Sequence, residues 1–206
     1  MKNYREKLSQ ITTFIFDFDG VLSDGKIYVI PGGEQLRATD VKDGYAIHYA
    51  LKQGFKVAII SGGYSETMRE RYANFPGMDV YLNIGDKIKT FHEYMEKHGL
   101  SQDEILYIGD DIPDYKVMQL AAVKCCPADA VEEIKSIADY ISHRPGGSGC
   151  VRDVIEQTMK AQGKWFGEGA EIWWGDWSDG TCLRKDKPFQ IFMTKFSNIK
   201  HTTWES

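Results

Sequence analysis

Short apolar runs alternate along most of this sequence with segments whose apolar residues recur every three or four positions. The runs predict strands at residues 11–17, 55–60, 80–84, 104–110 and 123–126, with a short sixth at 139–143. Helical patterns stand between them and begin near Asp43, Ser65, Asp86, Pro113, Asp129 and Cys150. This alternation predicts a doubly wound α/β fold with a mainly parallel sheet.

One segment, residues 26–40, interrupts the alternation. Two β-rich arms flank Pro31, Gly32 and Gly33, so we expect a β-hairpin that projects from the sheet. Its loop is too long for a two-residue turn.

The pattern changes again after Lys164. All five tryptophans lie beyond this residue, and the stretch WWGDWSDG has neither a helical nor a strand period. We therefore predict one domain over residues 1–164 and a Trp-rich extension over 165–206. An ordered extension, an aromatic contact surface and a disordered appendage fit this composition equally well.

Composition narrows the class of protein. The chain has 206 residues, 42% hydrophobic and 27% charged, which is typical of a single globular domain. It contains no apolar run long enough to cross a bilayer and no signal-peptide cleavage site, so we expect a cytoplasmic protein without a membrane partner. A net charge of −5 argues against a nucleic-acid partner but allows an anionic substrate beside a metal ion.

The candidate chemistry lies where predicted strands end. These positions carry Asp17 with Asp19, then Ser61, and finally Asp110, Asp111 and Asp114. Each residue taken singly fits a helix cap or a turn. The carboxyl ends of parallel strands face one crevice, however, and capping does not explain the whole set.

Gathered carboxylates repel one another unless a cation compensates them. Hard oxygen ligands suit Mg²⁺, whereas a zinc site would need His or Cys at ligand spacing, which is absent. Beside such an ion Asp17 can approach a phosphate and form an aspartyl phosphate. Asp19 can protonate the leaving alcohol and then activate water.

At this point the chain resembles the phosphatases of the haloacid dehalogenase superfamily. Four motifs occur in order: DFDGV from Asp17, the strand-ending Ser61, Lys87 in GDKIK, and GDDIPD from Gly109. The resemblance implies that Asp17 is the nucleophile and Asp19 the acid/base, with Ser61 and Lys87 clamping the phosphoryl group.

The same resemblance implies a metal site. Asp17, the backbone carbonyl of Asp19, and Asp110 would hold Mg²⁺. Asp111 and Asp114 would stabilise these ligands without binding the ion themselves. A lysine in the first turn of a helix is ordinarily a solvated surface residue. The position of Lys87 in the order of motifs argues for the clamp instead.

The intervals between motifs leave no room for the cap domain that many members insert. An uncapped site must be shielded from water by a large substrate or by a neighbouring subunit. The segments at 40–62, 107–118 and 144–156 resemble the capless 3-deoxy-D-manno-octulosonate 8-phosphate phosphatases, over residues 10–162 in all.

That closer resemblance implies a homotetramer whose hairpins and Gly-rich C-terminal segments close the active sites of neighbouring subunits. It implies an acidic sugar phosphate as substrate, on the route to lipopolysaccharide. Arg71 from an adjacent subunit would bind the carboxylate, or it is a surface arginine. Asp43 and Gly44 are a helix cap by local physics and a substrate loop by family position, and Gly62 would also contact substrate.

The chain departs from the family after its second strand. Ser-Gly-Gly replaces the more usual Thr-Gly-Arg or Thr-Gly-Glu, so phosphate clamping should survive while sugar selectivity can differ. Phosphatases for nine-carbon ulosonate 9-phosphates tend to carry Glu at the position of Gly63, which leaves that substrate as an alternative. A non-catalytic oligomerisation module is a third hypothesis, but such a domain should lack motif residues, and all are present here.

Overall fold

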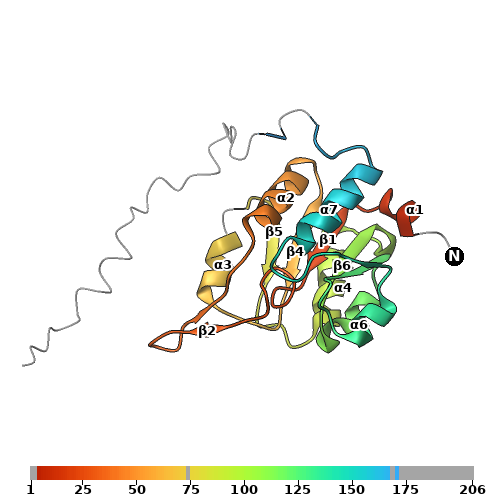
Figure 1. Ribbon diagram of the computed structural model, residues 1–206. Coiled ribbons are helices and arrows are strands. Elements are labelled where there is room, and N and C mark those ends of the chain that lie inside the picture. The colour runs from red at the N-terminus through yellow and green to blue at the C-terminus, as the bar shows by residue number, and fades with distance from the viewer. Residues whose placement is uncertain (1–3, 73–74, 168–169, 172–206) are drawn as a thin grey trace, which may run out of the picture. The chain divides into compact units, whose positions relative to one another are not determined.

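The computed structural model describes residues 4–72, 75–167 and 170–171, which belong to one compact unit spanning Met1–Trp173. Within them a parallel sheet of six strands has the order β5-β4-β1-β6-β7-β8 (Figure 1). The strands are β1 Thr13–Phe16, β4 Lys56–Ile60, β5 Met78–Tyr81, β6 Ile105–Ile108, β7 Val123–Cys126 and β8 Tyr140–Ile141. The predicted α/β fold and its parallel sheet are confirmed.

Strand β5 differs from its predicted position by two residues at the start and three at the end. Leu82 and Ile84 extended the apolar run, but Asn83 between them has a φ of 59°, which ends an extended strand. The amide of Ile84 instead donates to the carbonyl of Ser61 at 3.0 Å. This segment is therefore a loop held against the end of β4.

Helices cover both faces of the sheet. They are α1 Tyr4–Leu8, α2 Val41–Lys52, α3 Glu66–Tyr72, α4 Lys87–His98, α5 Tyr115–Met118, α6 Glu132–Ile137 and α7 Cys150–Ala161, with 3₁₀ turns η1 Gln102–Glu104 and η2 Ile112–Asp114. Helix α2 begins earlier than expected, because Asp40 rather than Asp43 accepts the cap hydrogen bond, from the amide of Lys42.

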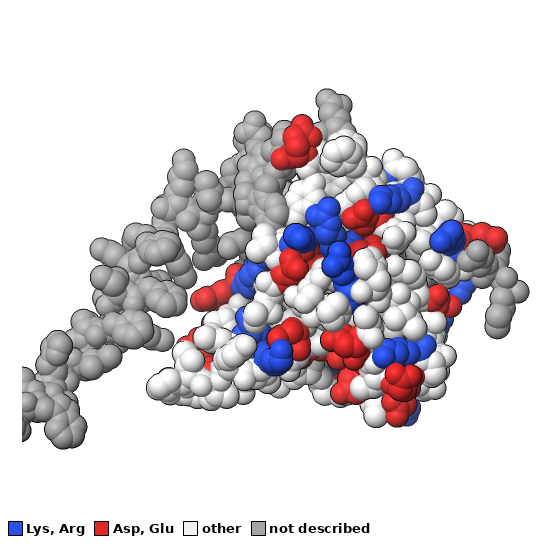
Figure 2. Space-filling model, in the orientation of Figure 1, with Lys and Arg blue, Asp and Glu red and all other residues white. Residues whose placement is uncertain are grey.

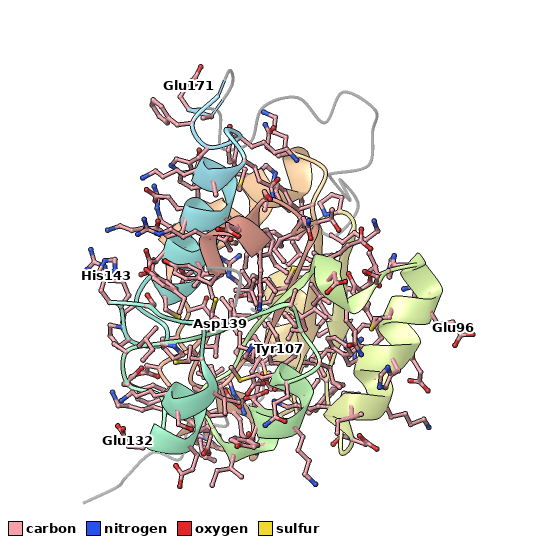
Figure 3. All side chains as sticks on the ribbon, turned by 90° about the vertical axis from the view of Figure 1, so that its right-hand side faces the viewer. Glu96, Tyr107, Glu132, Asp139, His143 and Glu171 are labelled. Atoms are coloured by element: carbon pink, nitrogen blue, oxygen red, sulfur yellow. The ribbon has the colours of Figure 1, made fainter. Side chains whose placement is uncertain are left out.

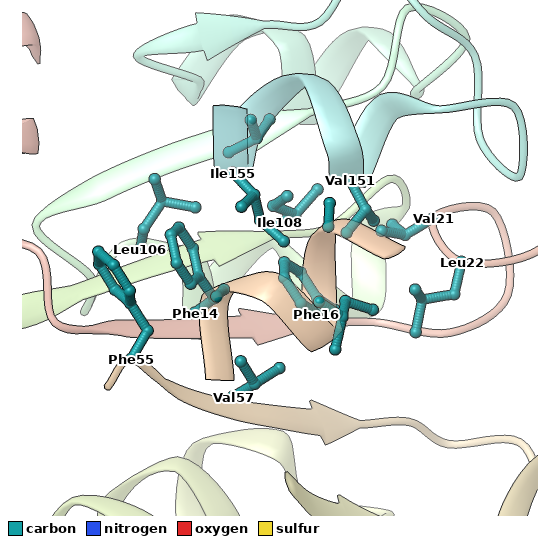
Figure 4. Close-up of a cluster of buried hydrophobic side chains, with 14 of the residues drawn as sticks. Phe14, Phe16, Val21, Leu22, Phe55, Val57, Leu106, Ile108, Val151 and Ile155 are labelled. Atoms are coloured by element: carbon teal, nitrogen blue, oxygen red, sulfur yellow. The ribbon is translucent and has the colours of Figure 1, made fainter. Parts of the chain in front are cut away.

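Alternate residues of the strands face opposite layers. Phe14 and Phe16 pack in one cluster with residues of α2 and α7, including Val151 and Ile155 (Figure 4). Ile15 faces the other cluster, which α4, α5 and α6 complete. Burial of each such side chain stabilises the fold by about 1.5–3 kcal/mol. The sheet is thus anchored on both sides, and its carboxyl edge holds the loops that carry polar residues.

The predicted hairpin is present as strands β2 Tyr28–Val29 and β3 Gln35–Leu36, paired antiparallel. Gly32 and Gly33 at its turn have φ values of 98° and 81°, which residues with a side chain rarely adopt. The hairpin extends away from the sheet (Figure 1). Between β1 and α4 the described residues form only this hairpin, α2, β4, α3, β5 and their loops.

The start of the Trp-rich extension packs on the α2–α7 side of the domain. Trp165 meets the ring of Tyr49 edge-on at 5.6 Å, and the amide of Gly167 donates to the Tyr49 hydroxyl at 3.0 Å. The Tyr45 hydroxyl donates to the carbonyl of Ala170. Residues 172–206, which make up most of the predicted extension, lie outside the described residues. No helix in the described ranges combines the length and apolarity that a bilayer span requires.

Candidate active site

The loops after β1, β4 and β6 meet at the carboxyl edge of the sheet and enclose a cleft of about 440 Å³. Among its lining residues are Asp17, Asp19, Ser61, Gly62, Lys87, Asp110 and Asp111. The Gly20 loop lies so close to the third strand end that a Cβ at Gly20 would fall 1.9 Å from Asp110 Oδ2. Gly20 also has a φ of 84°, so this loop requires glycine on both counts.

Lys87 is the central cation of the cleft. Its Nζ lies 3.1 Å from Asp17 Oδ2 and 2.8 Å from Asp114 Oδ1, and its side chain is only 8% exposed. The hydroxyl of Tyr107, which lies in the interior in Figure 3, donates to the same Asp114 oxygen at 2.8 Å. Lys87 is therefore held by two buried carboxylates and is not a solvated helix residue.

Asp17, Asp110 and Asp114 form the group of the described residues that could hold a metal ion. One oxygen from each lies within 4.8 Å of the others. Asp110 Oδ1 and Asp114 Oδ2 are buried and have no hydrogen-bond partner among the described residues. Unpaired buried carboxylate oxygens are unfavourable, and an oxygen-seeking divalent cation such as Mg²⁺ would satisfy them. The donor set therefore fits magnesium.

The acidity of these groups reflects their surroundings. Burial, and next the charge of Asp114, raise the pKa of Asp17 to about 8 against the opposing effect of Lys87. Burial, with Asp114 and Asp111 close by, raises the pKa of Asp110 to about 7. In the metal-free protein protons therefore neutralise these carboxyl groups near neutral pH, and a bound cation must displace them.

These shifts predict how stability depends on pH. Both groups ionise near pH 4 when unfolded, so between about pH 4 and 8 the folded chain binds more protons and loses stability as pH rises. In EDTA we expect Tm to fall by about 5 °C from pH 6 to 8.5, and Mg²⁺ to raise Tm more at pH 8.5 than at pH 6.

Thermal unfolding with and without metal checks this, and Asp110→Asn is the matched variant. Its amide does not titrate, so the fall in Tm in EDTA should be shallower than in the wild type. A wild-type Tm that rises over this pH range relative to Asp110→Asn would contradict the assignment.

Asp19 has a partner that motif reasoning did not anticipate. Arg37 donates from Nε to Asp19 Oδ1 at 2.6 Å and from Nη2 to Oδ2 at 3.1 Å. The Ser23 hydroxyl also donates to Oδ1, at 3.2 Å. Arg37 lies in the hairpin and belongs to no motif. The one signal in the sequence was a lone basic residue in the second arm of the hairpin.

The remaining polar residues of the cleft are held by backbone amides. Ser61 is 1% exposed, and its Oγ accepts a hydrogen bond from the amide of Gly63 at 3.2 Å. Asp111 is exposed and accepts from the amide of Ile112 at 2.7 Å, which caps η2. Ser61 thus follows β4 directly and lines the same cleft as Lys87, and its role in a phosphoryl clamp stays a prediction.

Asp43, Gly44 and Arg71 do not line this cleft. Asp43 is buried and accepts from the amides of Gly149 at 3.2 Å and Arg152 at 2.6 Å, so it caps the start of α7. Arg71 donates to the Thr39 hydroxyl at 3.4 Å and packs beside Gly44. A substrate-binding role for these three residues stays a prediction and would have to involve another subunit.

Comparison with known proteins places this geometry in a family. Residues 71–151 match the haloacid dehalogenase-like hydrolase family. The chain is 38% identical over 158 residues to the 3-deoxy-D-manno-octulosonate 8-phosphate phosphatase KdsC of Salmonella typhi, covering 77% of this chain and 84% of that protein. The chain belongs to this phosphatase family.

Solved structures of the family agree with the fold. The phosphatase of that name from Yersinia pestis has a TM-score of 0.77 and 32% identity, over 79% of this chain and 88% of that one. The enzyme from Moraxella catarrhalis, in complex with a magnesium ion, a phosphate ion and a KDO molecule, has a TM-score of 0.76 and 31% identity. That match covers 79% of this chain and 94% of the other.

Proposed function

We infer that this chain is a Mg²⁺-dependent phosphatase that hydrolyses 3-deoxy-D-manno-octulosonate 8-phosphate to the free sugar acid and phosphate. The observation that supports this is the group of three carboxylates, Asp17, Asp110 and Asp114, beside Lys87. Two buried oxygens of this group have no hydrogen-bond partner among the described residues, and the chain belongs to the family of these phosphatases. The reaction belongs to lipopolysaccharide precursor synthesis, and we place it in the cytoplasm.

The residues of the cleft can carry out both halves of the hydrolysis. A carboxylate oxygen of Asp17 bonds to phosphorus while the bond from phosphorus to the sugar oxygen breaks. The electron pair stays on that oxygen, which takes a proton from Asp19. Water then attacks the aspartyl phosphate and gives a proton to Asp19, and phosphate and the Asp17 carboxylate are released.

Lys87 and Ser61 hold the phosphoryl oxygens during both transfers. Lys87 is already fixed between two carboxylates, so it needs little reorganisation to stabilise charge on the phosphoryl group. Asp17 and Asp110, with Asp114 beside them, would hold magnesium, which would supply positive charge to offset the repulsion between these carboxylates and an anionic substrate.

A second part of the proposal is that the chain assembles as a homotetramer whose subunits shield one another's clefts. The support is an exposed apolar end of the hairpin: Tyr28 is 57% and Val29 69% exposed, with Ile27 and Ile30 beside them. The end of this hairpin is largely white in Figure 2. Exposed apolar surface of this kind is typical of an interface.

Loss of this apolar surface should dissociate the assembly. In the double variant Tyr28→Ser and Val29→Ser we expect dissociation constants to rise by about 10³-fold, since each of the two interface anchors contributes about 2 kcal/mol. Sedimentation velocity over a concentration series measures this. The matched control is Ile141→Ser, which removes an apolar side chain that is 45% exposed on the sheet edge. A double variant that sediments like the wild type would contradict the role of the hairpin.

The substrate is tested by phosphate release from full-length protein with Mg²⁺. We expect kcat/KM for the octulosonate 8-phosphate to exceed that for a nine-carbon ulosonate 9-phosphate and for simple sugar phosphates. Activity toward p-nitrophenyl phosphate should disappear in EDTA. A preference for the nine-carbon substrate would reassign the specificity, and no metal-dependent release from any ester would refute the enzyme.

A further inference from the structure

Arg37 joins the projecting hairpin to the catalytic loop. Its side chain is only 3% exposed, while that of Asp19 is 29% exposed. A buried guanidinium is unfavourable without an ionic partner, and Asp19 supplies one through two nitrogens of the same fork. The conformation of the Asp19 carboxylate therefore depends on a residue from a separate element.

The two oxygens of Asp19 are held unequally. Oδ1 accepts from two donors, Arg37 Nε and the Ser23 hydroxyl, whereas Oδ2 accepts from just one donor among the described residues, Arg37 Nη2, over a longer distance. Oδ2 is also the oxygen next to Gly63: a Cβ built at Gly63 would lie 2.7 Å from it. Asp19 and Gly63 both line the cleft. Oδ1 is thus the anchored oxygen, and Oδ2 is the one presented beside Gly63.

Gly63 makes this arrangement possible. The same Cβ would lie 3.4 Å from Arg37 Nη2, so any side chain at position 63 would compete with the pair for space. The nearest atom is the end of a side chain rather than backbone, so a substitution would displace the Asp19 carboxylate first. Gly63 and Arg37 therefore both border the same carboxylate oxygen, Asp19 Oδ2.

We propose that Arg37 is a positioning residue that orients Asp19 Oδ2 for proton transfer to the leaving oxygen, and that Gly63 keeps the space this orientation needs. The inference rests on the proposed phosphatase function and adds the residue that orients its general acid, Asp19. Arg37 acts on the reaction only through Asp19.

This role predicts a dependence on the leaving group. A sugar alkoxide must be protonated as it leaves, whereas p-nitrophenolate is stable enough to leave without a proton. Because kcat/KM reports the steps up to the first transfer, comparison of the two esters isolates the step that Asp19 assists as an acid. A residue that only stabilises the fold would alter both esters equally.

The experiment measures kcat/KM for 3-deoxy-D-manno-octulosonate 8-phosphate and for p-nitrophenyl phosphate in Arg37→Met and Gly63→Ala. We expect a loss of about 10- to 100-fold with the sugar phosphate and less than about threefold with the aryl ester, in both variants. Arg37→Lys should recover part of the loss. Lys26→Met is the control, because Lys26 is an exposed cation of the same hairpin paired only with Asp24 among described residues.

Equal losses for the two esters in Arg37→Met, or no loss at all, would overturn the proposal. Failure of the proposed function gives a different result, because the wild-type chain would then hydrolyse neither ester. If the wild type prefers another primary sugar phosphate, that ester replaces the octulosonate in the same comparison. Circular dichroism and Tm of each variant separate misfolding from misplacement of Asp19.

Discussion

Asp17→Asn is expected to abolish phosphate release while the fold persists. The amide is a poor nucleophile and a weaker metal ligand, so we expect kcat to fall about 10⁴-fold or more. The fold should tolerate the change, because burial raises the pKa of Asp17 to about 8 and the ionised side chain is unfavourable where it stands. In EDTA at pH 8 the Tm of the variant should equal or exceed that of the wild type.

Asp24→Asn is the matched control for this prediction. Asp24 follows the same strand but pairs with the exposed Lys26 at 3.0 Å and does not line the cleft. Its replacement should leave phosphate release within about twofold, since an exposed ion pair contributes little and this one lies outside the cleft. Turnover of Asp17→Asn at the wild-type rate would end the assignment of Asp17 as nucleophile.

Lys87→Met is expected to remove both activity and stability. The substitution leaves Asp17 and Asp114 facing each other without the cation that lies 3.1 Å and 2.8 Å from them. Removing one partner from a buried ionic cluster costs about 3–5 kcal/mol, which urea unfolding at pH 8 in EDTA would detect. Loss of the phosphoryl clamp should lower kcat by about 10²-fold or more.

Two further variants test the cause of this loss. Lys87→Met combined with Asp114→Asn removes one of the opposed charges, so stability should return in part while activity stays low. Lys89→Met, two residues along α4, removes a lysine that is 72% exposed and should change stability by about 1 kcal/mol or less. If Lys87→Met unfolds at the same urea concentration as Lys89→Met, Lys87 does not offset a repulsion between Asp17 and Asp114.

Local patterns were sufficient to predict the layers of this protein. Strands β1, β4, β6 and β7 are buried, and each stands in the sequence as a mainly apolar run. Pro31 and two glycines mark the turn of the hairpin. Asp17, Ser61 and Asp110 come at the ends of β1, β4 and β6. Because parallel strands end at one edge, their gathering around a cleft follows from chain order together with sheet topology.

Asp43, Arg37 and the end of β5 required the tertiary structure. Asp43 reads as a cap of the helix that contains it, yet it caps α7, whose first residues lie more than 100 positions away. Arg37 meets Asp19 only because the base of the hairpin packs beside the loop after β1, 18 residues earlier in the chain. Hydrophobic period follows from the repeat of the local backbone, and capping signals from hydrogen bonds within a few residues, so the sequence by itself determined the elements and the motif residues at their ends. Pairing between distant charges depends on how whole elements pack, and packing alone decided which carboxylates share Lys87, which one Arg37 orients, and which one caps α7.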